Sequence, residues 1–285
     1  MSRRNRSNNT LKIAGLSSIL AIGAGSLGYI TWQSMGKAVA DEYGCFTEAP
    51  QRQSVALIDV SGPKFNEEQS RSLSRYFSQT YDQLDFNERL SVVTTSEDQI
   101  GSVPKASFHV CGQATNPEQL TAINAEAATS GFLARQKTRL NEQIFAPAME
   151  QILSPDSESR QRFQSPILEM VQGIRRFHPL KTGDRLIIVS DLIQNSDTVQ
   201  FCRTQNDMPP FSIFRDKPEY SRLKPETLEG IDIEVLMIQR QGYGSGSFSF
   251  CYSEEELRTF WHDYLVANGA IEPSIIRVRH GFIED

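Results

Sequence analysis

The sequence contains few of the residues that carry metal or thiol chemistry. Its 285 residues include four widely scattered histidines and four cysteines, no two of which form a C-x-x-C pair. Zinc ribbons and redox motifs need closely spaced ligands or thiols, so neither is expected here. The G-x-S-x-G elbow of the α/β-hydrolases is missing as well.

A long basic run is also missing. Residues 1–40 hold five of the 29 bases and none of the 35 acids, so the rest of the chain carries a net charge of −11. Such a body has no basic surface with which to neutralise phosphates, and we expect no nucleic-acid partner. The remaining composition, with 39% hydrophobic and 22% charged residues, is that of a globular protein and excludes a wholly disordered chain.

An uncharged segment, residues 13–32, follows a basic amino terminus. At about 1.5 Å per residue, a helix of this length spans a hydrocarbon core of about 30 Å. The arginines of residues 1–12 place that end in the cytoplasm by the positive-inside rule, and the body outside. We therefore expect a single-pass anchor in the inner (plasma) membrane and an extracytoplasmic body, which is periplasmic in a Gram-negative cell.

A cleaved secretory signal is the alternative to this anchor. The sequence Ala38-Val39-Ala40 fits the small-x-small pattern of a signal-peptidase site. Cleavage after Ala40 would release the body as a secreted protein. Both interpretations export the same chain, with residues 33–51 as a linker and residues 52–285 as one domain.

Two near-continuous apolar runs dominate this domain. Residues 54–60 (SVALIDV) and 185–191 (RLIIVSD) are typical of parallel strands that are covered on both faces. Further strands are expected at residues 90–95, 107–111, 232–239 and 274–279.

Amphipathic helical stretches alternate with these strands. They cover residues 67–84, 117–153 with a restart near Pro147, 166–177, and 254–268 with Ser253 as a cap and Trp261 and Tyr264 in the core. Alternating strands and helices predict an α/β fold of three layers, Rossmann-like, with a mostly parallel sheet between helices. Residues 195–230 contain four prolines and are expected to form a surface insertion.

Four cysteines in an exported body are compatible with two disulfides in any of three connectivities. Cys202 and Cys251 both follow strands and are expected at one edge of the sheet, so we pair them first. Cys45 and Cys111 would then form the second pair.

Oxygen-bearing side chains follow two of the strands. Asp59 and Ser61 come after the first strand, Asp191 ends a later one, and Ser165 precedes the helix between them. Because parallel sheets bind ligands at the carboxyl ends of their strands, these side chains are expected to gather there. An all-oxygen set suits Mg²⁺, with Ca²⁺ or Mn²⁺ as alternatives.

With these residues the chain resembles the von Willebrand factor A-like domains over residues 52–282. Their metal-ion-dependent adhesion site has Asp-x-Ser-x-Ser after the first strand, a Thr before a helix and an Asp after the next strand. Asp59 and Ser61, then Ser165 in place of Thr, then Asp191 match this order. Pro63 stands where the second Ser belongs, so the site looks degenerate, as in a divergent bacterial exported branch.

The resemblance implies a module that binds another protein and does not turn over a substrate. We therefore expect a membrane-anchored interaction module, whose partner docks at this edge through the cation. Three alternatives remain open. They are an exported hydrolase using Ser61 and His109, a glycosidase using Asp59 and Asp191, and a structural subunit of an envelope or transfer machine.

Each residue also has a structural explanation. Asp59 and Asp191 could end their strands and cap the following loops. Ser165 could cap the helix that begins near Pro166. The placement of all four residues together favours the functional interpretation.

Overall fold

The structure is a computed structural model that describes residues 36–61, 65–95, 104–154, 164–178, 180–201, 208–239, 252–279 and 282–284. The expected anchor 13–32, Pro63, Cys202 and Cys251 lie outside these residues. Among the helices of the described residues, none combines the length and the apolar character that crossing a membrane requires.

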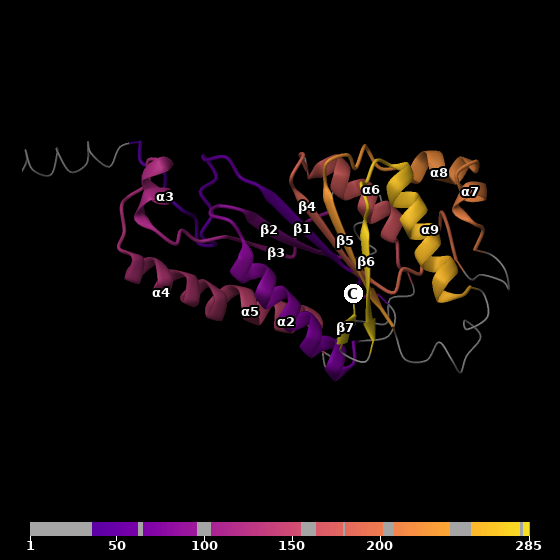
Figure 1. Ribbon diagram of the computed structural model, residues 1–285, viewed down its shortest axis with the longest axis horizontal. Coiled ribbons are helices and arrows are strands. Elements are labelled where there is room, and N and C mark those ends of the chain that lie inside the picture. Colours follow the sequence, from indigo (N-terminus) through magenta and orange to yellow (C-terminus); the bar gives the residue numbers. More distant parts are fainter. Residues whose placement is uncertain are drawn as a thin grey trace, which may run out of the picture.

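A mixed, mostly parallel sheet forms the centre of the fold (Figure 1). Its seven strands lie in the order β3-β2-β1-β4-β5-β6-β7. They are β1 (Gln53–Ile58), β2 (Arg89–Thr94), β3 (Phe108–Cys111), β4 (Arg185–Ser190), β5 (Asp232–Ile238), β6 (Ser274–Arg279) and β7 (Phe282–Glu284). The edge strands β3 and β7 are antiparallel to their neighbours, and the five between them are parallel. The predicted α/β class is confirmed, and β7 is the strand that the apolar pattern did not indicate.

Most helices of the described residues follow the predicted stretches, with one break, but two short ones, Phe211–Phe214 and Pro218–Leu223, lie in the segment 195–230 that was expected to be a surface insertion. The helices are α2 (Glu67–Gln83), α3 (Pro117–Ala122), α4 (Ser130–Leu140), α5 (Ala146–Leu153), α6 (Ile167–Phe177), α7 (Phe211–Phe214), α8 (Pro218–Leu223) and α9 (Glu254–Ala267). The stretch 117–153 is interrupted after α3, where Asn124 takes a positive φ of 55°. A π-helical turn, Asn141–Phe145, joins α4 to α5 just before Pro147, which has no N–H to donate.

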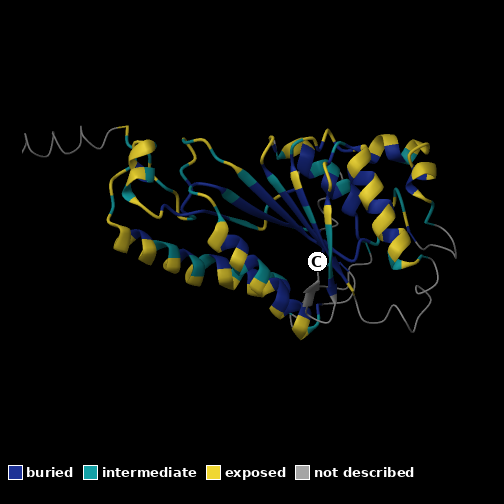
Figure 2. Ribbon diagram, in the orientation of Figure 1, coloured by how far each residue is buried: buried dark blue, intermediate teal, exposed yellow. Residues whose placement is uncertain are grey.

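Both faces of the sheet are buried, because consecutive residues of a strand point to opposite sides. Val55 and Leu57 of β1 belong to the core under α6 and α9, whereas Ala56 and Ile58 belong to the core under α2 and α5. Figure 2 shows this dark, buried centre between helices whose outer faces are exposed. The near-continuous apolar runs of β1 and β4 follow from this double cover.

The described part of the segment 195–230, residues 195–201 and 208–230, is more deeply packed than a surface insertion. It contains α7 and α8, and its aromatic side chains Phe211, Phe214 and Tyr220 are buried. Phe211 meets Phe260 and Tyr264 of α9 edge to face. The segment therefore extends the core beside α9. Its prolines suggest a loop, but its aromatic side chains provide a large apolar area that is buried against α9. Trp261 and Tyr264 are fully buried, as predicted.

The strand order reverses beside β1. The chain moves from β1 to β2 on one side and later returns to β4 on the other side. In open α/β sheets such a reversal leaves a crevice at the carboxyl ends of the two strands. Asp59 follows β1 and Asp191 follows β4, so both lie at this edge.

Candidate functional site

The candidate site lies at the carboxyl edge, the edge of the sheet at which the parallel strands end. Asp59 is at its centre. Its backbone N–H continues the ladder to β4 by donating to the Val189 carbonyl at 2.8 Å, and the residue is 1% exposed. One carboxylate oxygen, Oδ1, accepts hydrogen bonds from the N–H and the hydroxyl of Ser61. The same oxygen accepts a third bond from the Thr95 hydroxyl at 3.0 Å.

The other carboxylate oxygen of Asp59 accepts hydrogen bonds from hydroxyls that are distant in the sequence. Oδ2 accepts hydrogen bonds from Ser165 at 2.9 Å and from Ser190 at 2.8 Å. The four hydroxyls come from the loop after β1, the end of β2, the segment before α6 and the end of β4. Asp59, Ser61 and Ser165 are thus brought together, as the sequence predicts.

Thr95 and Ser190 are site residues that the sequence analysis did not identify. The register shows why they are present: Ile58 lies opposite Thr94 on one side and Val189 on the other. The next residue along each strand therefore lies beside Asp59. A single hydroxyl residue after a strand is too common in sequences to indicate a site. Only the pairing of β1 with both β2 and β4 shows that Thr95 and Ser190 lie beside Asp59.

Asp191 lies one residue beyond Ser190 and is 7% exposed. Its carboxylate Oδ1 accepts a hydrogen bond from the Ile193 N–H at 3.0 Å. Tyr252, at the start of the segment that leads into α9, is close enough for electrostatic coupling to Asp191. Burial raises the pKa of Tyr252, and the negative charge of Asp191 raises it further.

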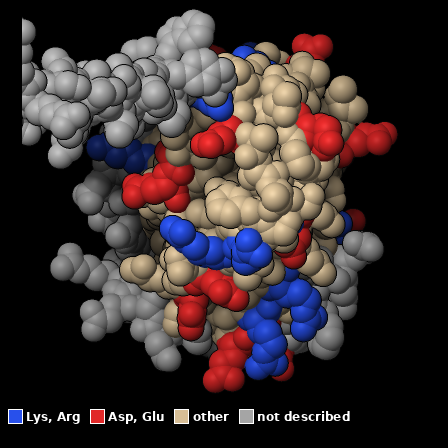
Figure 3. Space-filling view, turned by 90° about the vertical axis from the view of Figure 1, so that its left-hand side faces the viewer, with Lys and Arg blue, Asp and Glu red and all other residues tan. Residues whose placement is uncertain are grey.

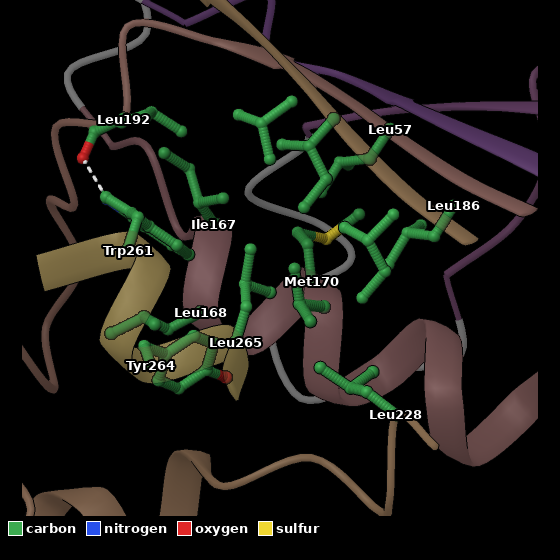
Figure 4. Packing of buried hydrophobic residues seen from close by; sticks show 14 of the residues in the cluster. Leu57, Ile167, Leu168, Met170, Leu186, Leu192, Leu228, Trp261, Tyr264 and Leu265 are labelled. Carbon is green, nitrogen blue, oxygen red and sulfur yellow. Dashed lines mark hydrogen bonds between the residues drawn. The ribbon is translucent and has the colours of Figure 1, made fainter. Parts of the chain in front are cut away.

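The turn after Asp191 has an unusual backbone. Leu192 is fully buried yet has a φ of 65°, in the left-handed region that costs a branched side chain energy. Two bonds hold it there: its N–H donates to the Ser190 hydroxyl, and its carbonyl accepts from the indole of Trp261 at 2.8 Å. Figure 4 shows the second bond, between Trp261 of α9 and the turn. Strain of this kind is concentrated at functional sites.

The segment before α6 is locked to the loop after β4. Ser165 and Asn195 exchange two backbone hydrogen bonds, of 2.7 and 2.9 Å. The fully buried side chain of Gln194 accepts from the Leu168 N–H and donates to the Glu169 carboxylate. The loops that carry the site are therefore preorganised by contacts of their own.

The alternative role of Ser165 as a helix cap is not what the structure shows. The first residue before α6 is Pro166, and no side chain caps the helix from that position. Gln194 satisfies the Leu168 N–H instead, and the Ser165 hydroxyl points to Asp59. The orientation of the Ser165 side chain is explained by its bond to Asp59, and not by capping of α6. We call the Asp59 carboxylate and its four hydroxyl donors, Ser61, Thr95, Ser165 and Ser190, the oxygen cluster.

The donor set fits a hard cation. A hydroxyl that donates its proton to Asp59 still has lone pairs to offer, and carboxylate and hydroxyl oxygens are the ligands that Mg²⁺ and Ca²⁺ take. Asp59, Ser61, Ser165 and Asp191 offer oxygen atoms only. Tetrahedral zinc sites, which use sulfur and nitrogen, do not match this set.

The pair needed for a serine hydrolase is not assembled. His109 of β3 lies opposite Ser91 of β2, which lies opposite Val55. Asp59, to which Ser61 is bonded, is four residues beyond Val55, or roughly 13 Å along the strand at about 3.3 Å per residue. His109 instead contacts the ring of Tyr43 in a tilted arrangement, with ring centroids 4.4 Å apart.

The disulfide expected as the second pair is present, between Cys45 and Cys111. Both cysteines are fully buried. The proposed Cys202–Cys251 pair falls outside the described residues. The comparisons add no family: no protein-family model matches the chain, and a search of curated proteins finds no significant match.

Proposed function

We propose that the protein is a membrane-anchored, extracytoplasmic interaction module with a von Willebrand factor A-like fold, which binds another protein at its carboxyl edge through a divalent cation. The observation that carries this proposal is the Asp59 carboxylate, which receives hydroxyls from four separate segments where the strand order reverses. The order Asp59, Ser61, Ser165, Asp191 supports the resemblance. The preorganised loops support a rigid docking face.

Asp59, Ser61, Ser165 and Asp191 would hold the cation. When bound, the cation would offer a positive charge and open coordination positions to an oxygen of the partner. Asp59 would orient the hydroxyls of Ser61 and Ser165, because their protons are directed to its carboxylate. Pro63 cannot supply the second hydroxyl of the first loop, so water or the partner would supply that oxygen.

The proposed anchor would enter the domain at the opposite edge of the sheet. The described chain begins at Gly36, and the segment that follows is joined through Cys45 to Cys111. Cys111 lies opposite Arg89, the first residue of β2. An anchor at 13–32 would therefore leave the carboxyl edge facing away from the membrane, open to a partner.

Surface charge at the end of the molecule opposite the carboxyl edge does not suit a nucleic acid. Figure 3 views the end that lies on the left in Figure 1, near α3 and α4, and there Lys and Arg side chains lie between Asp and Glu side chains over the described part of the surface. Binding to a phosphate backbone relies on a coherent basic field. The mixed surface at this end provides no such field.

A photo-crosslinking experiment tests the docking face. A photoreactive amino acid at Asp197, exposed after β4, is compared in the native host with one at Thr182, exposed before β4. We expect a discrete protein adduct from position 197 that EDTA and the Asp191→Asn variant remove, and none from position 182. Equal adducts from both positions, or an adduct that is indifferent to EDTA and Asp191→Asn, would reject the proposal.

A further inference from the structure

A second group of ligand-bearing side chains lies at the edge strand β3, away from the oxygen cluster. One atom each of Asp41, Cys45 and His109 lies within 4.8 Å of the others. Cys111 is not one of these three residues, but it is covalently bonded to Cys45. The four residues form two short patterns, Asp-x-x-x-Cys and His-x-Cys.

The first pattern is a closed turn. The Asp41 N–H donates to the Cys45 carbonyl at 2.9 Å, and Gly44 supports the turn with a φ of 78°. A Cβ at Gly44 would lie 2.1 Å from the side chain of Gln113. The Asp41 oxygen Oδ1 accepts from the Tyr43 and Cys45 N–H groups, so the other oxygen is left toward His109 at 3.9 Å.

The second pattern uses the period of a strand. His109 and Cys111 are two residues apart on β3, so both side chains lie on one face. The ring of Tyr43 packs against His109 in a tilted arrangement, with an interplanar angle of 52°. The two cysteines are buried, whereas the side chain of His109 is 22% exposed to solvent.

We propose that reduction of the Cys45–Cys111 disulfide turns this corner into a zinc site, with Cys45, Cys111, His109 and Asp41 as its four ligands. Two sulfurs, one imidazole nitrogen and one carboxylate oxygen are ligands that Zn²⁺ takes in tetrahedral geometry. Bonds of about 2.0–2.3 Å place neighbouring ligand atoms about 3.3–3.8 Å apart. The ligand atoms of Asp41, Cys45 and His109 would need to move by only about an ångström to reach that spacing, and the Cys111 sulfur, freed by reduction, would complete the set.

The reduction step is balanced by a dithiol. A dithiol reductant attacks the disulfide, forms its own disulfide and leaves two thiols on this chain. Each thiol loses one proton as its thiolate binds Zn²⁺. The group of Asp41, Cys45, His109 and Cys111 would therefore hold either a disulfide or a metal ion. Either one attaches the segment 36–49 to the sheet.

Cobalt is the probe for the test, because tetrahedral Co²⁺ bound to thiolates gives characteristic absorption. The full-length protein in detergent, oxidised or reduced with a phosphine, is titrated with Co²⁺ and then with Zn²⁺. We expect the reduced chain to bind one Co²⁺ more than the oxidised chain. This ion should give a thiolate charge-transfer band that Zn²⁺ abolishes and that the oxidised chain lacks.

Variants separate this site from other thiols. A Cys45→Ser and Cys111→Ser double variant keeps Cys202 and Cys251 and is expected to lose the band. His109→Ala and Asp41→Asn should each weaken binding at least about tenfold, the lower limit known for the loss of even an outer-shell partner. Glu42→Gln, an exposed neighbouring acid, is the matched control and should bind as the wild type does. Absent binding, or binding that is indifferent to His109 or to the two cysteines, would overturn the proposal whether or not the reduced chain keeps its fold.

Discussion

The hydroxyl of Ser165 donates to the carboxylate of Asp59 at 2.9 Å, although 106 residues separate them. The bond joins the segment before α6 to the loop after β1. The Ser190 hydroxyl makes the matching bond from β4. One buried carboxylate thus connects segments that meet only when the parallel sheet is complete, so its removal should affect stability as well as binding.

Asp59→Ala should lower the free energy of unfolding by about 3 kcal/mol, because several buried donors lose their acceptor. Urea unfolding of wild type and variant measures the difference. Asp82→Ala, at an exposed acid of α2 with a surface ion pair to Lys137, is the control and should cost less than about 1 kcal/mol. Equal stability of the wild type and Asp59→Ala would show that the carboxylate is not the centre of the structure at this edge.

Thr95→Val tests one hydroxyl without changing the volume. The Thr95 hydroxyl donates to Asp59 and accepts from the Val60 N–H at 3.1 Å. Losing both bonds in a buried position should cost about 1–3 kcal/mol. Thr94→Val, one residue earlier, removes a hydroxyl that pairs with the exposed Ser107 hydroxyl and should cost less than about 0.5 kcal/mol. If the two variants lose the same stability, the bond to Asp59 has no special weight.

Leu192 should reverse the usual order of alanine and glycine. Both Leu192→Ala and Leu192→Gly lose a fully buried side chain, at a cost of about 2–5 kcal/mol. At a φ of 65°, however, alanine retains a strain of about 1–2 kcal/mol that glycine avoids. Thermal unfolding should therefore find the glycine variant more stable than the alanine variant. The opposite order would contradict the left-handed turn after Asp191.

The capping box of α9 makes stability depend on acidic pH. The backbone N–H of Ser253 donates to the Glu256 carboxylate, the Ser253 hydroxyl accepts from the Glu256 N–H, and these contacts lower the pKa of Glu256. An acid whose pKa is lowered by folding stabilises the folded protein at pH values above its unfolded pKa of 4.5. This contribution disappears as the pH falls through the lower pKa of the folded state.

Glu256→Gln should therefore be less stable than the wild type at pH 7, with the difference shrinking toward pH 3. Melting temperatures across this range measure it, with Glu255→Gln in the same helical turn as the control. A difference that stays constant with pH would exclude an ionised Glu256 as the source. Ser253→Ala, which removes the cap itself, should cost about 1 kcal/mol.

Apolar patterning predicts most of this fold because the sheet is covered on both sides. The runs of β1 and β4 are nearly uninterrupted, so both strands and the acids that follow them can be placed from the sequence. The short β7 has no such pattern. The break after α3 is also hidden, because apolar spacing continues across residues 123–129 while the backbone turns at Asn124.

The site could be predicted only in part. Asp59, Ser61 and Ser165 stand in a recognisable order, and the structure joins them through hydrogen bonds. The positions of Thr95 and Ser190 beside Asp59 depend on the register of β1 with β2 and β4, and this register cannot be read from the amino-acid sequence. The strained turn at Leu192 depends on a carbonyl held by Trp261, 69 residues away.

A crystal of the protein soaked in Mn²⁺ tests the central claim most directly, because anomalous scattering locates the ion without assumptions. The account predicts one Mn²⁺ bound by oxygens of Asp59, Ser61, Ser165 and Asp191, and its loss in Asp191→Asn. An anomalous map with no ion at this edge, while Mn²⁺ is bound elsewhere or not at all, would contradict it.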